Sequence, residues 1–454
     1  MVDVEPSRVK HVSTVEYKDD SYYGGVQVGM GEPQLSAIRA SMSHSTRRRP
    51  RDDGDAHSPF DGCLLENNCD RLRAAWLDGS LDLAAVERSC RTLLRGAKRL
   101  AATGQTTPAS AWGSWSAGAC PSDAVVSRCR TWLALLYLQR GNVKGARPIL
   151  HRLGFIVRLS SRILRYDAAL ASADTDPDPS APGFVDNVVT DSVLLALQRI
   201  FEPIAASYWR DHEYRVDPPS SYFSYVVPIA EPNGDDTVLA SLVQRALAAV
   251  CLRFPEAAAA RFVELWAHNR PHGSGHQLHF DSDDEGRDGI RHPLATSVLV
   301  VCGSCGGPTL VTTQRLGDTH LARSGWLCFP KSNRLFMFDS TLLHGVIPGR
   351  GAPPNGTPRR VTLMLAFWRD IQHRHDSKPG AARPLLALAE RPPASRPEWL
   401  SLLLSNAGPS SDDGRRLVLR SPPALSHVWE CVATDEPCAA SSPIVAYERA
   451  FQGF

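Results

Sequence analysis

The stretch HQLHFDSDDE, from His276 to Glu285, holds two histidines and four acidic residues within ten positions. Imidazole nitrogens and carboxylate oxygens are common ligands of divalent transition metals. If the stretch is a β-strand, alternate residues share a face, so His279 and Asp281 point to the same side. Leu278 then points the other way, toward an apolar core. The stretch therefore predicts a metal platform, and a charged surface turn is the alternative.

A metal site needs a further ligand, and His344 is the best candidate for it. It lies in NRLFMFDSTLLHGVIPG, after an apolar strand and a short turn, so we expect it at the start of the next strand. Two histidines and one carboxylate on one side of a metal leave coordination positions open, as in non-haem Fe(II) oxygenases. The other histidines that we considered lack such surroundings; they are His272, His276, His292 and His320.

A predicted strand, RRVTLMLAFW, follows from Arg359 to Trp368. Strand alternation places Arg360 and Thr362 on one face and Arg359 on the other. A guanidinium fork pairs bidentately with a carboxylate, and a threonine hydroxyl two residues on can donate to the same group. The strand therefore predicts a site for a carboxylate.

The elements that must position these residues are short strands. Between about residues 260 and 370 the chain holds short apolar segments separated by turns, with no long helical pattern. They are RFVELWAHN, GHQLHFD, ATSVLVVC, GPTLVTT, GWLCFP, NRLFMFD, GVIPG and RVTLMLAFW. Such a series is typical of an antiparallel sandwich or jelly roll.

The sequence predicts three parts. Residues 1–58 are polar and lack apolar periodicity, so we expect a disordered tail. Residues 59–182 read as a helical region, and residues 183–454 as a domain with the strand-rich core and a C-terminal extension. Within that domain FVDNVVTDSVLLALQRIFEPIAASYW and DDTVLASLVQRALAAVCLRF each predict a helix, and YFSYVVPIA between them predicts a strand.

The bulk composition is that of an ordinary globular protein. The chain has 454 residues, is 43% hydrophobic and carries a net charge of +2, which gives no field to attract nucleic acid or an anionic membrane. No apolar run could span a bilayer and no secretory signal is visible, so we expect an intracellular protein, cytoplasmic or nuclear. The run TRRRPR reads as part of a solvated tail, with a nuclear address as the alternative.

The eleven cysteines show no repeating spacing. Cys302 and Cys305 form one CxxC, but a structural zinc site wants a second ligand pair, and the sequence offers none at a suitable spacing. We therefore interpret these two residues as ordinary reduced thiols, and a zinc site is the alternative.

Residues from about Phe262 to Trp368 resemble the catalytic double-stranded β-helix of the Fe(II)/2-oxoglutarate-dependent dioxygenases, most of all the prolyl 4-hydroxylase-like branch. The resemblance is carried by the HxD pair His279 and Asp281, by the distal His344, and by Arg360 with Thr362. GGPTLV is similar to a Gly-Gly-x-Thr turn of that branch, and GWLCFPKSNRLFMFDS to its strand pair before the distal histidine. An arginine stands where that branch carries lysine, and the loop PGRGAPPNGTP lengthens the spacing before it.

The resemblance implies an α+β fold, with a jelly-roll catalytic core, a helical N-terminal region and helices covering the sheet. It implies Fe(II) bound by His279, Asp281 and His344, with no catalytic residue beyond these ligands. It also implies 2-oxoglutarate that chelates the iron and is anchored by Arg360 and Thr362. O2 and 2-oxoglutarate would be consumed as a substrate is hydroxylated, and ascorbate is an open accessory reductant.

The resemblance leaves the prime substrate open. We expect a protein or peptide side chain first, a small molecule second and a nucleic-acid base third. Nucleic-acid demethylases of the AlkB type carry asparagine and a second arginine where this chain has Thr362 and Ala366. The acidic residues Asp283, Asp284 and Glu285 read as a solvated loop, with a substrate contact of Asp284 as the alternative. A cupin-like metal-binding module without turnover is the alternative from another functional class.

Overall fold

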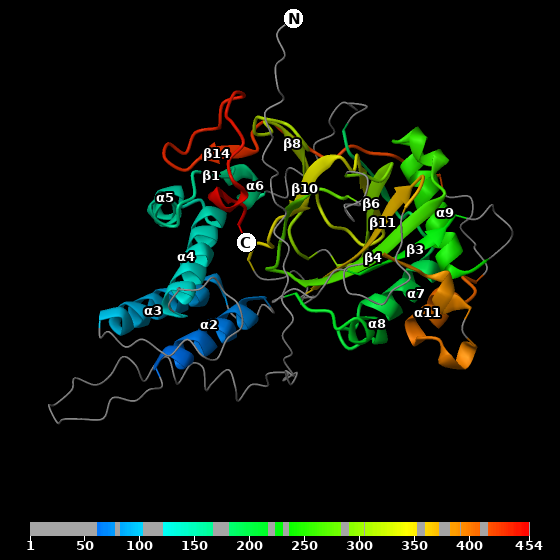
Figure 1. Ribbon diagram of the computed structural model, residues 1–454, viewed down its shortest axis with the longest axis horizontal. Coiled ribbons are helices and arrows are strands. Elements are labelled where there is room, and N and C mark those ends of the chain that lie inside the picture. The colour runs from blue at the N-terminus through cyan, green and yellow to red at the C-terminus, as the bar shows by residue number, and fades with distance from the viewer. Residues whose placement is uncertain are drawn as a thin grey trace, which may run out of the picture. The chain divides into compact units, whose positions relative to one another are not determined.

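The computed structural model has an α+β fold (Figure 1). It describes residues 61–77, 82–102, 121–166, 181–216, 223–229, 236–282, 290–303, 305–351, 359–371, 382–390, 392–408 and 416–453. The chain divides into two units, one of Met1–Asn68 with Thr92–Val126 and the other of Cys69–Arg91 with Ser127–Phe454. Every residue of the candidate site belongs to the second unit.

Two sheets carry the site. The seven-stranded sheet has the order β12-β3-β4-β11-β6-β9-β2, and the five-stranded sheet has the order β13-β8-β7-β10-β5. The strands of the first are β2 (Gly183–Asp186), β3 (Ser224–Pro228), β4 (Phe262–Pro271), β6 (Ala295–Cys302), β9 (Arg334–Phe338), β11 (Arg359–Trp368) and β12 (Ala382–Pro384). Those of the second are β5 (His276–His279), β7 (Thr309–Arg315), β8 (Gly325–Cys328), β10 (Leu342–Val346) and β13 (Ala424–Leu425).

Helices cover one face of the seven-stranded sheet. They are α7 (Asp191–Phe201), α8 (Ser207–Asp211), α9 (Val238–Cys251) and α11 (Glu398–Leu403), and they lie beside β3, β4 and β11 in Figure 1. Val361, Leu363 and Leu365 of β11 are buried against them in the main hydrophobic core. Each such leucine stabilises the fold by about 1.5–3 kcal/mol. Because β11 alternates, Arg360 and Thr362 lie on the opposite face of the sheet.

The remaining helices lie earlier in the chain or in short connections. They are α2 (Asp61–Leu77), α3 (Leu83–Ala102), α4 (Pro121–Gln139), α5 (Val143–Arg152), α6 (Ser161–Arg165) and α10 (Leu386–Ala389), with 3-10 turns at Pro255–Ala259, Pro393–Ser395 and Tyr447–Arg449. Among the described residues, no helix is long and apolar enough to cross a membrane.

A small third sheet joins distant parts of the chain. It has the order β14-β1-β15, from β1 (Val157–Leu159), β14 (Trp429–Cys431) and β15 (Ala450–Phe451). Arg158 of β1 is 1% exposed and forms ion pairs with Glu430 at 2.5 Å and Asp435 at 3.2 Å. The ion pairs and the strand pairing hold the residues after Trp429 against β1.

Three local expectations differ from the structure. The segment predicted as one long helix holds β2, α7 and α8, because Gly183–Asp186 finds a partner in β9 and Thr190 caps a new helix. Strand β1, in the region expected to be helical, pairs with residues about 270 positions away, which local pattern cannot reveal. Strand β10 begins at Leu342, so His344 lies within a strand instead of at its start.

Some expectations fall outside the described residues. These are the tail 1–58, the run TRRRPR and the acidic residues Asp283, Asp284 and Glu285.

Candidate metal centre

Strand pairing brings His279 and His344 together. Strands β5 and β10 are antiparallel neighbours, and in their register the Cα atoms of His279 and His344 are direct partners. β10 can approach this closely because the next residue is Gly345, where a Cβ would lie 2.7 Å from the carbonyl oxygen of His276. Asp281 follows two residues after the end of β5. Its side chain still turns to the same point, as strand alternation predicted.

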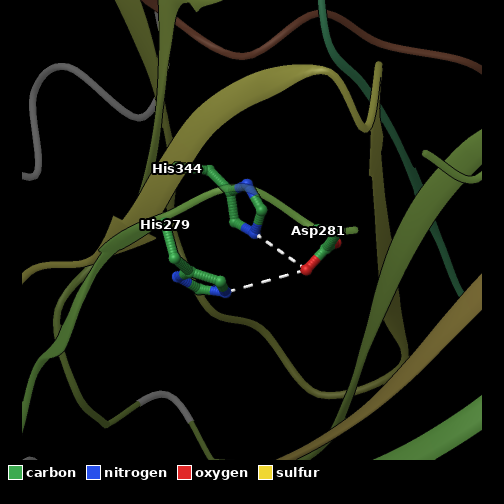
Figure 2. Close-up of side chains that lie close together, drawn as sticks. All are labelled: His279, Asp281 and His344. Atoms are coloured by element: carbon green, nitrogen blue, oxygen red, sulfur yellow. Dashed lines mark ion pairs between the residues drawn. The ribbon is translucent and has the colours of Figure 1, made fainter. Parts of the chain in front are cut away.

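The side chains of His279 and His344 both point toward Asp281 (Figure 2). Asp281 Oδ1 lies 3.7 Å from His279 Nε2 and 3.6 Å from His344 Nε2. All three candidate ligand atoms lie within 4.8 Å of one another. These separations are too long for hydrogen bonds. Three lone-pair atoms that face one point without a proton shared between them fit a metal ion well.

Other contacts leave those three atoms free for a metal. His279 Nδ1 lies 2.8 Å from the carbonyl oxygen of Gln277, and His344 Nδ1 lies 3.0 Å from that of Leu342. Nδ1–H donates in each case, so Nε2 keeps its lone pair. Thr296 Oγ1 donates to Asp281 Oδ2 at 2.8 Å, so Oδ1 faces the centre. Such outer contacts orient metal ligands in known sites.

The surroundings favour neutral histidines. Burial lowers the pKa of His279, and the neighbouring His344 lowers it further. Burial also holds the pKa values of His268 and His276 well below their usual range. The four rings form a row, with centroids 5.1 Å apart for His268 and His276, 4.7 Å for His276 and His279, and 4.4 Å for His279 and His344. Metal binding needs the neutral imidazole, so the site is prepared for it.

An aromatic side chain closes one side of the centre. The ring of Phe338 lies 4.5 Å from that of His344, centroid to centroid, and Phe338 is fully buried. Asp281 and His344 expose 10% and 8% of their side-chain surface, whereas His279 exposes 34%. The centre is therefore enclosed on the side of His344 and open on the side of His279.

At the predicted carboxylate site, Arg360 is joined by a second arginine, Arg270, on the same face of the sheet. Arg360 of β11 and Arg270 of β4 are direct register partners. Arg360 is 6% exposed and donates to the carbonyl oxygen of Gly307 at 2.9 Å. Burial, together with the neighbouring Arg270, lowers its pKa to about 10. Among the residues that the structure describes, no carboxylate pairs with either guanidinium.

Arg270 itself is incompletely satisfied. Its Nη1 donates to the carbonyl oxygen of Gly275 at 2.9 Å, while its buried Nε has no hydrogen-bond partner in the described structure. Like charges directly opposite on neighbouring strands destabilise a sheet, and an unpaired buried donor adds to that cost. A bound carboxylate would relieve both effects.

The adjacent arginine takes another role. Arg359 donates through Nη2 to the carbonyl oxygen of Asn269 at 2.6 Å and through Nε to the Asn269 side chain. Asn269 in turn donates to the carbonyl oxygen of Phe201 at the end of α7. Arg359 thus lies on the helix-covered face, opposite to Arg360 and Thr362. Thr362 is 3% exposed.

The other histidines that we weighed as ligands, His276 among them, do not belong to the converging group found among the described residues. His272 Nδ1 accepts from the Gly306 N–H at 2.8 Å, His292 Nδ1 lies 2.6 Å from the carbonyl oxygen of Asp281, and His320 is exposed. Cys302 and Cys305 are buried free thiols. Burial raises the pKa of Cys302 to about 12 and that of Cys305 to about 11, so both stay protonated at neutral pH.

Sequence reasoning missed Thr296 and Arg270. The sequence carried a signal for Arg270 alone. In FVELWAHNRP the polar or aromatic residues Glu264, Trp266, His268 and Arg270 alternate with Val263, Leu265 and Ala267, whereas in ATSVLVVC Thr296 is followed by Ser297 and shares its face with apolar residues. The alternation marks a polar face, but only the register with β11 shows that Arg270 meets Arg360.

No protein-family model matches the chain, and no curated protein does. Among solved structures it is similar to a prolyl-4-hydroxylase from Pseudomonas putida, with 17% identity over 43% of this chain and 94% of that one and a TM-score of 0.26. It is also similar to apo HygX from Streptomyces hygroscopicus, with 14% identity over 45% of this chain and 93% of that one and a TM-score of 0.27. A 2OG-Fe(II) oxygenase family oxidoreductase from Burkholderia pseudomallei has 14% identity over 36% of this chain and 72% of that one, with a TM-score of 0.20. These TM-scores are low, so the likenesses do not establish a common fold, and the function proposed below rests on the arrangement of the site residues.

Proposed function

We propose that this protein is an Fe(II)- and 2-oxoglutarate-dependent dioxygenase that hydroxylates its substrate. The observation that carries the proposal is the convergence of His279 Nε2, His344 Nε2 and Asp281 Oδ1, each left free by its outer contacts. Two histidines and one carboxylate on one side of a metal are the ligand set of non-haem Fe(II) oxygenases. The donor atoms present therefore fit the metal.

The strand order supports a double-stranded β-helix as the catalytic core. Strands β4, β6, β9 and β11 belong to the larger sheet, and β5, β7, β8 and β10 belong to the smaller one. The chain therefore passes repeatedly between two sheets, as in a jelly roll. In this arrangement the ligand strands β5 and β10 stand side by side in one sheet. Across from them in the other sheet, His268 of β4 lies against His276 and Phe338 of β9 lies against His344.

The arginine pair supports 2-oxoglutarate as the cosubstrate. A dicarboxylate that chelates the metal at one end needs a cationic anchor at the other, and Arg360 provides a guanidinium that no described carboxylate neutralises. We assign Arg270 to the same carboxylate, because it stands directly opposite in register and has a spare buried donor. Thr362, two residues from Arg360 on the same face, completes the anchor.

When bound, Fe(II) and 2-oxoglutarate would activate O2, so that one oxygen atom enters the substrate C–H bond and the other enters succinate as CO2 leaves. The protein's own contribution would be to hold the metal and the cosubstrate and to enclose the site. His279 stays neutral because burial opposes its protonation and that of the neighbouring His276. Thr296 fixes the carboxylate of Asp281, and Phe338 excludes water beside His344. The side of His279 is left for the prime substrate.

Succinate formation tests the proposal directly. The full chain, loaded anaerobically with Fe(II), should bind 2-oxoglutarate and convert it to succinate and CO2 when O2 is admitted, with ascorbate present and absent. Arg270→Met should weaken 2-oxoglutarate binding about tenfold or more, since a charge-assisted hydrogen bond contributes about 1.5–3 kcal/mol. A protein that binds metal but forms no succinate with any substrate would instead be the non-catalytic metal-binding module.

The prime substrate belongs to the proposal as an order of preference. A protein or peptide side chain comes first, a small molecule second and a nucleic-acid base third. The nucleic-acid base comes last because the near-neutral charge of the chain offers no field that would attract phosphates. A screen of peptides, small molecules and oligonucleotides for stimulated succinate formation decides among them.

A further inference from the structure

Strand β5, which carries His279, is an edge strand. It pairs with β10 on one side, and among the strands that the structure describes none pairs with it on the other. An edge strand presents backbone groups that need partners. Leu278 turns both of its groups outward: its N–H donates to Gln452 Oε1 at 2.9 Å, and its carbonyl oxygen accepts from the Tyr447 hydroxyl at 3.3 Å. Side chains that lie 174 and 169 residues farther along the chain therefore complete the edge of the ligand strand.

The residues that supply these partners are themselves held firmly. Gln452 is 5% exposed and follows Phe451, which is 1% exposed. Phe451 packs edge-on against Phe155 at 5.2 Å between ring centroids, and β15 pairs in parallel with β1, where the red end of the chain lies in Figure 1. The Tyr447 hydroxyl also lies 3.2 Å from Gln452 Oε1. Gln452 is thus a fixed acceptor and not a mobile surface side chain.

The position of Leu278 sets that of the next residue. β5 is four residues long, and its pairing with β10 contains an irregularity between His344 and Val346. β10 alone therefore defines the strand weakly. The N–H of Leu278 held by Gln452 fixes the strand on its other side, one residue before His279. We infer that Gln452 is a positioning residue for the metal centre: through Leu278 it sets the place of His279, so the small sheet β14-β1-β15 is coupled to metal affinity. Tyr447 supports it.

This inference rests on the proposed iron site, and it is tested on the full chain with Co(II), which binds oxygen and nitrogen ligands and has a visible spectrum. Gln452→Leu removes the acceptor at similar size. We expect Co(II) affinity to fall about tenfold, the lower end of the range for loss of a contact made directly by a metal ligand, because Gln452 acts through the neighbouring Leu278. Gln452→Glu keeps an acceptor oxygen and should restore much of the affinity and the parent's Co(II) spectrum. Tyr447→Phe should have a smaller effect in the same direction.

Gln198→Leu is the control. Gln198 likewise bonds to the backbone of a strand, but as a donor: its side-chain amide donates to the carbonyl oxygen of Val301 on β6, in the other sheet. The Gln198→Leu protein should bind Co(II) with the same affinity as the parent. Amide hydrogen exchange of the metal-free proteins gives an independent readout: Leu278 should exchange faster in Gln452→Leu and not in Gln198→Leu.

The outcomes separate the two claims. A parent that binds no Co(II) overturns the iron site and the inference built on it. A parent that binds Co(II), with Gln452→Leu binding equally well or Gln198→Leu losing as much, overturns the positioning role and leaves the proposed function standing.

Discussion

Arg270 and Arg360 stand directly opposite each other on the antiparallel strands β4 and β11, although both carry a positive charge. The face they share has no described carboxylate partner for either, and burial lowers the pKa of both. A protein that keeps two such groups together loses stability in the absence of an anion. The arginine pair therefore lowers the stability of the ligand-free protein and at the same time strengthens the binding of an anion.

The first prediction follows from that opposition. Arg270→Met removes one charge and the unsatisfied Nε while it keeps the length of the side chain. The ligand-free protein should be more stable by up to about 1 kcal/mol, and 2-oxoglutarate binding should be weaker. Thermal unfolding with and without 2-oxoglutarate measures both effects. Lower stability together with unchanged affinity would show that Arg270 does not share the anion.

The second prediction separates two neighbouring arginines of the same chemistry. Arg360→Ala should raise the 2-oxoglutarate concentration for half-maximal turnover roughly ten- to a hundredfold, because it removes a charge-assisted pair. Arg359→Ala should leave that concentration unchanged, since Arg359 bonds to Asn269 on the other face. Steady-state titration of both variants decides. Equal effects would mean that the cosubstrate is not anchored on the face of Arg360.

The third prediction concerns the ligand set. His279→Ala, Asp281→Ala and His344→Ala should each abolish turnover and weaken Fe(II) binding while leaving the fold intact, because none of the three belongs to the apolar core. His320→Ala, at an exposed position, is the control. Anaerobic Fe(II) titration and circular dichroism measure binding and fold. A His344→Ala protein that binds iron like the parent would remove His344 from the set.

The fourth prediction tests the hydroxyl that orients Asp281. Thr296→Val keeps the shape of the side chain and removes the donor to Asp281 Oδ2. Metal affinity should fall about ten- to a hundredfold. Thr313→Val, which removes a hydroxyl bonded to the carbonyl oxygen of Ser324, should not change it. Isothermal titration with Mn(II) compares the two, and equal affinities would argue that Asp281 needs no support from Thr296.

The fifth prediction concerns the contact between the ligand strands. In Gly345→Ala the new methyl group would lie 2.7 Å from the carbonyl oxygen of His276, so β5 and β10 must move apart. We expect the free energy of metal binding to fall by more than the free energy of unfolding. Gly317→Ala is the control, because it strains a turn with φ +88° where nothing lies within 4 Å. If both variants bind metal like the parent, the close approach is not needed for the site.

The local sequence predicts those site residues whose orientation depends on a single segment, and not those that are placed by contacts between distant segments. His279 and Asp281 were predictable because two positions on one extended segment share a face whatever lies around them. The same rule separated Arg360 from Arg359, and β11 follows it over its whole length. The strand-rich core between residues 260 and 370 was predictable because short apolar runs between turns leave no room for helices.

The tertiary structure alone decided the rest. The segment Gly183–Asp186 has a pattern that also suits a helix, and its pairing with β9 makes it a strand. Arg270 meets Arg360, Thr296 meets Asp281, and Gln452 meets Leu278 only through register and packing between segments far apart in the chain. Strand alternation determines which way a side chain points, because it is a property of one backbone. What that side chain meets depends on which strands become neighbours, and that is settled by burial of the whole core.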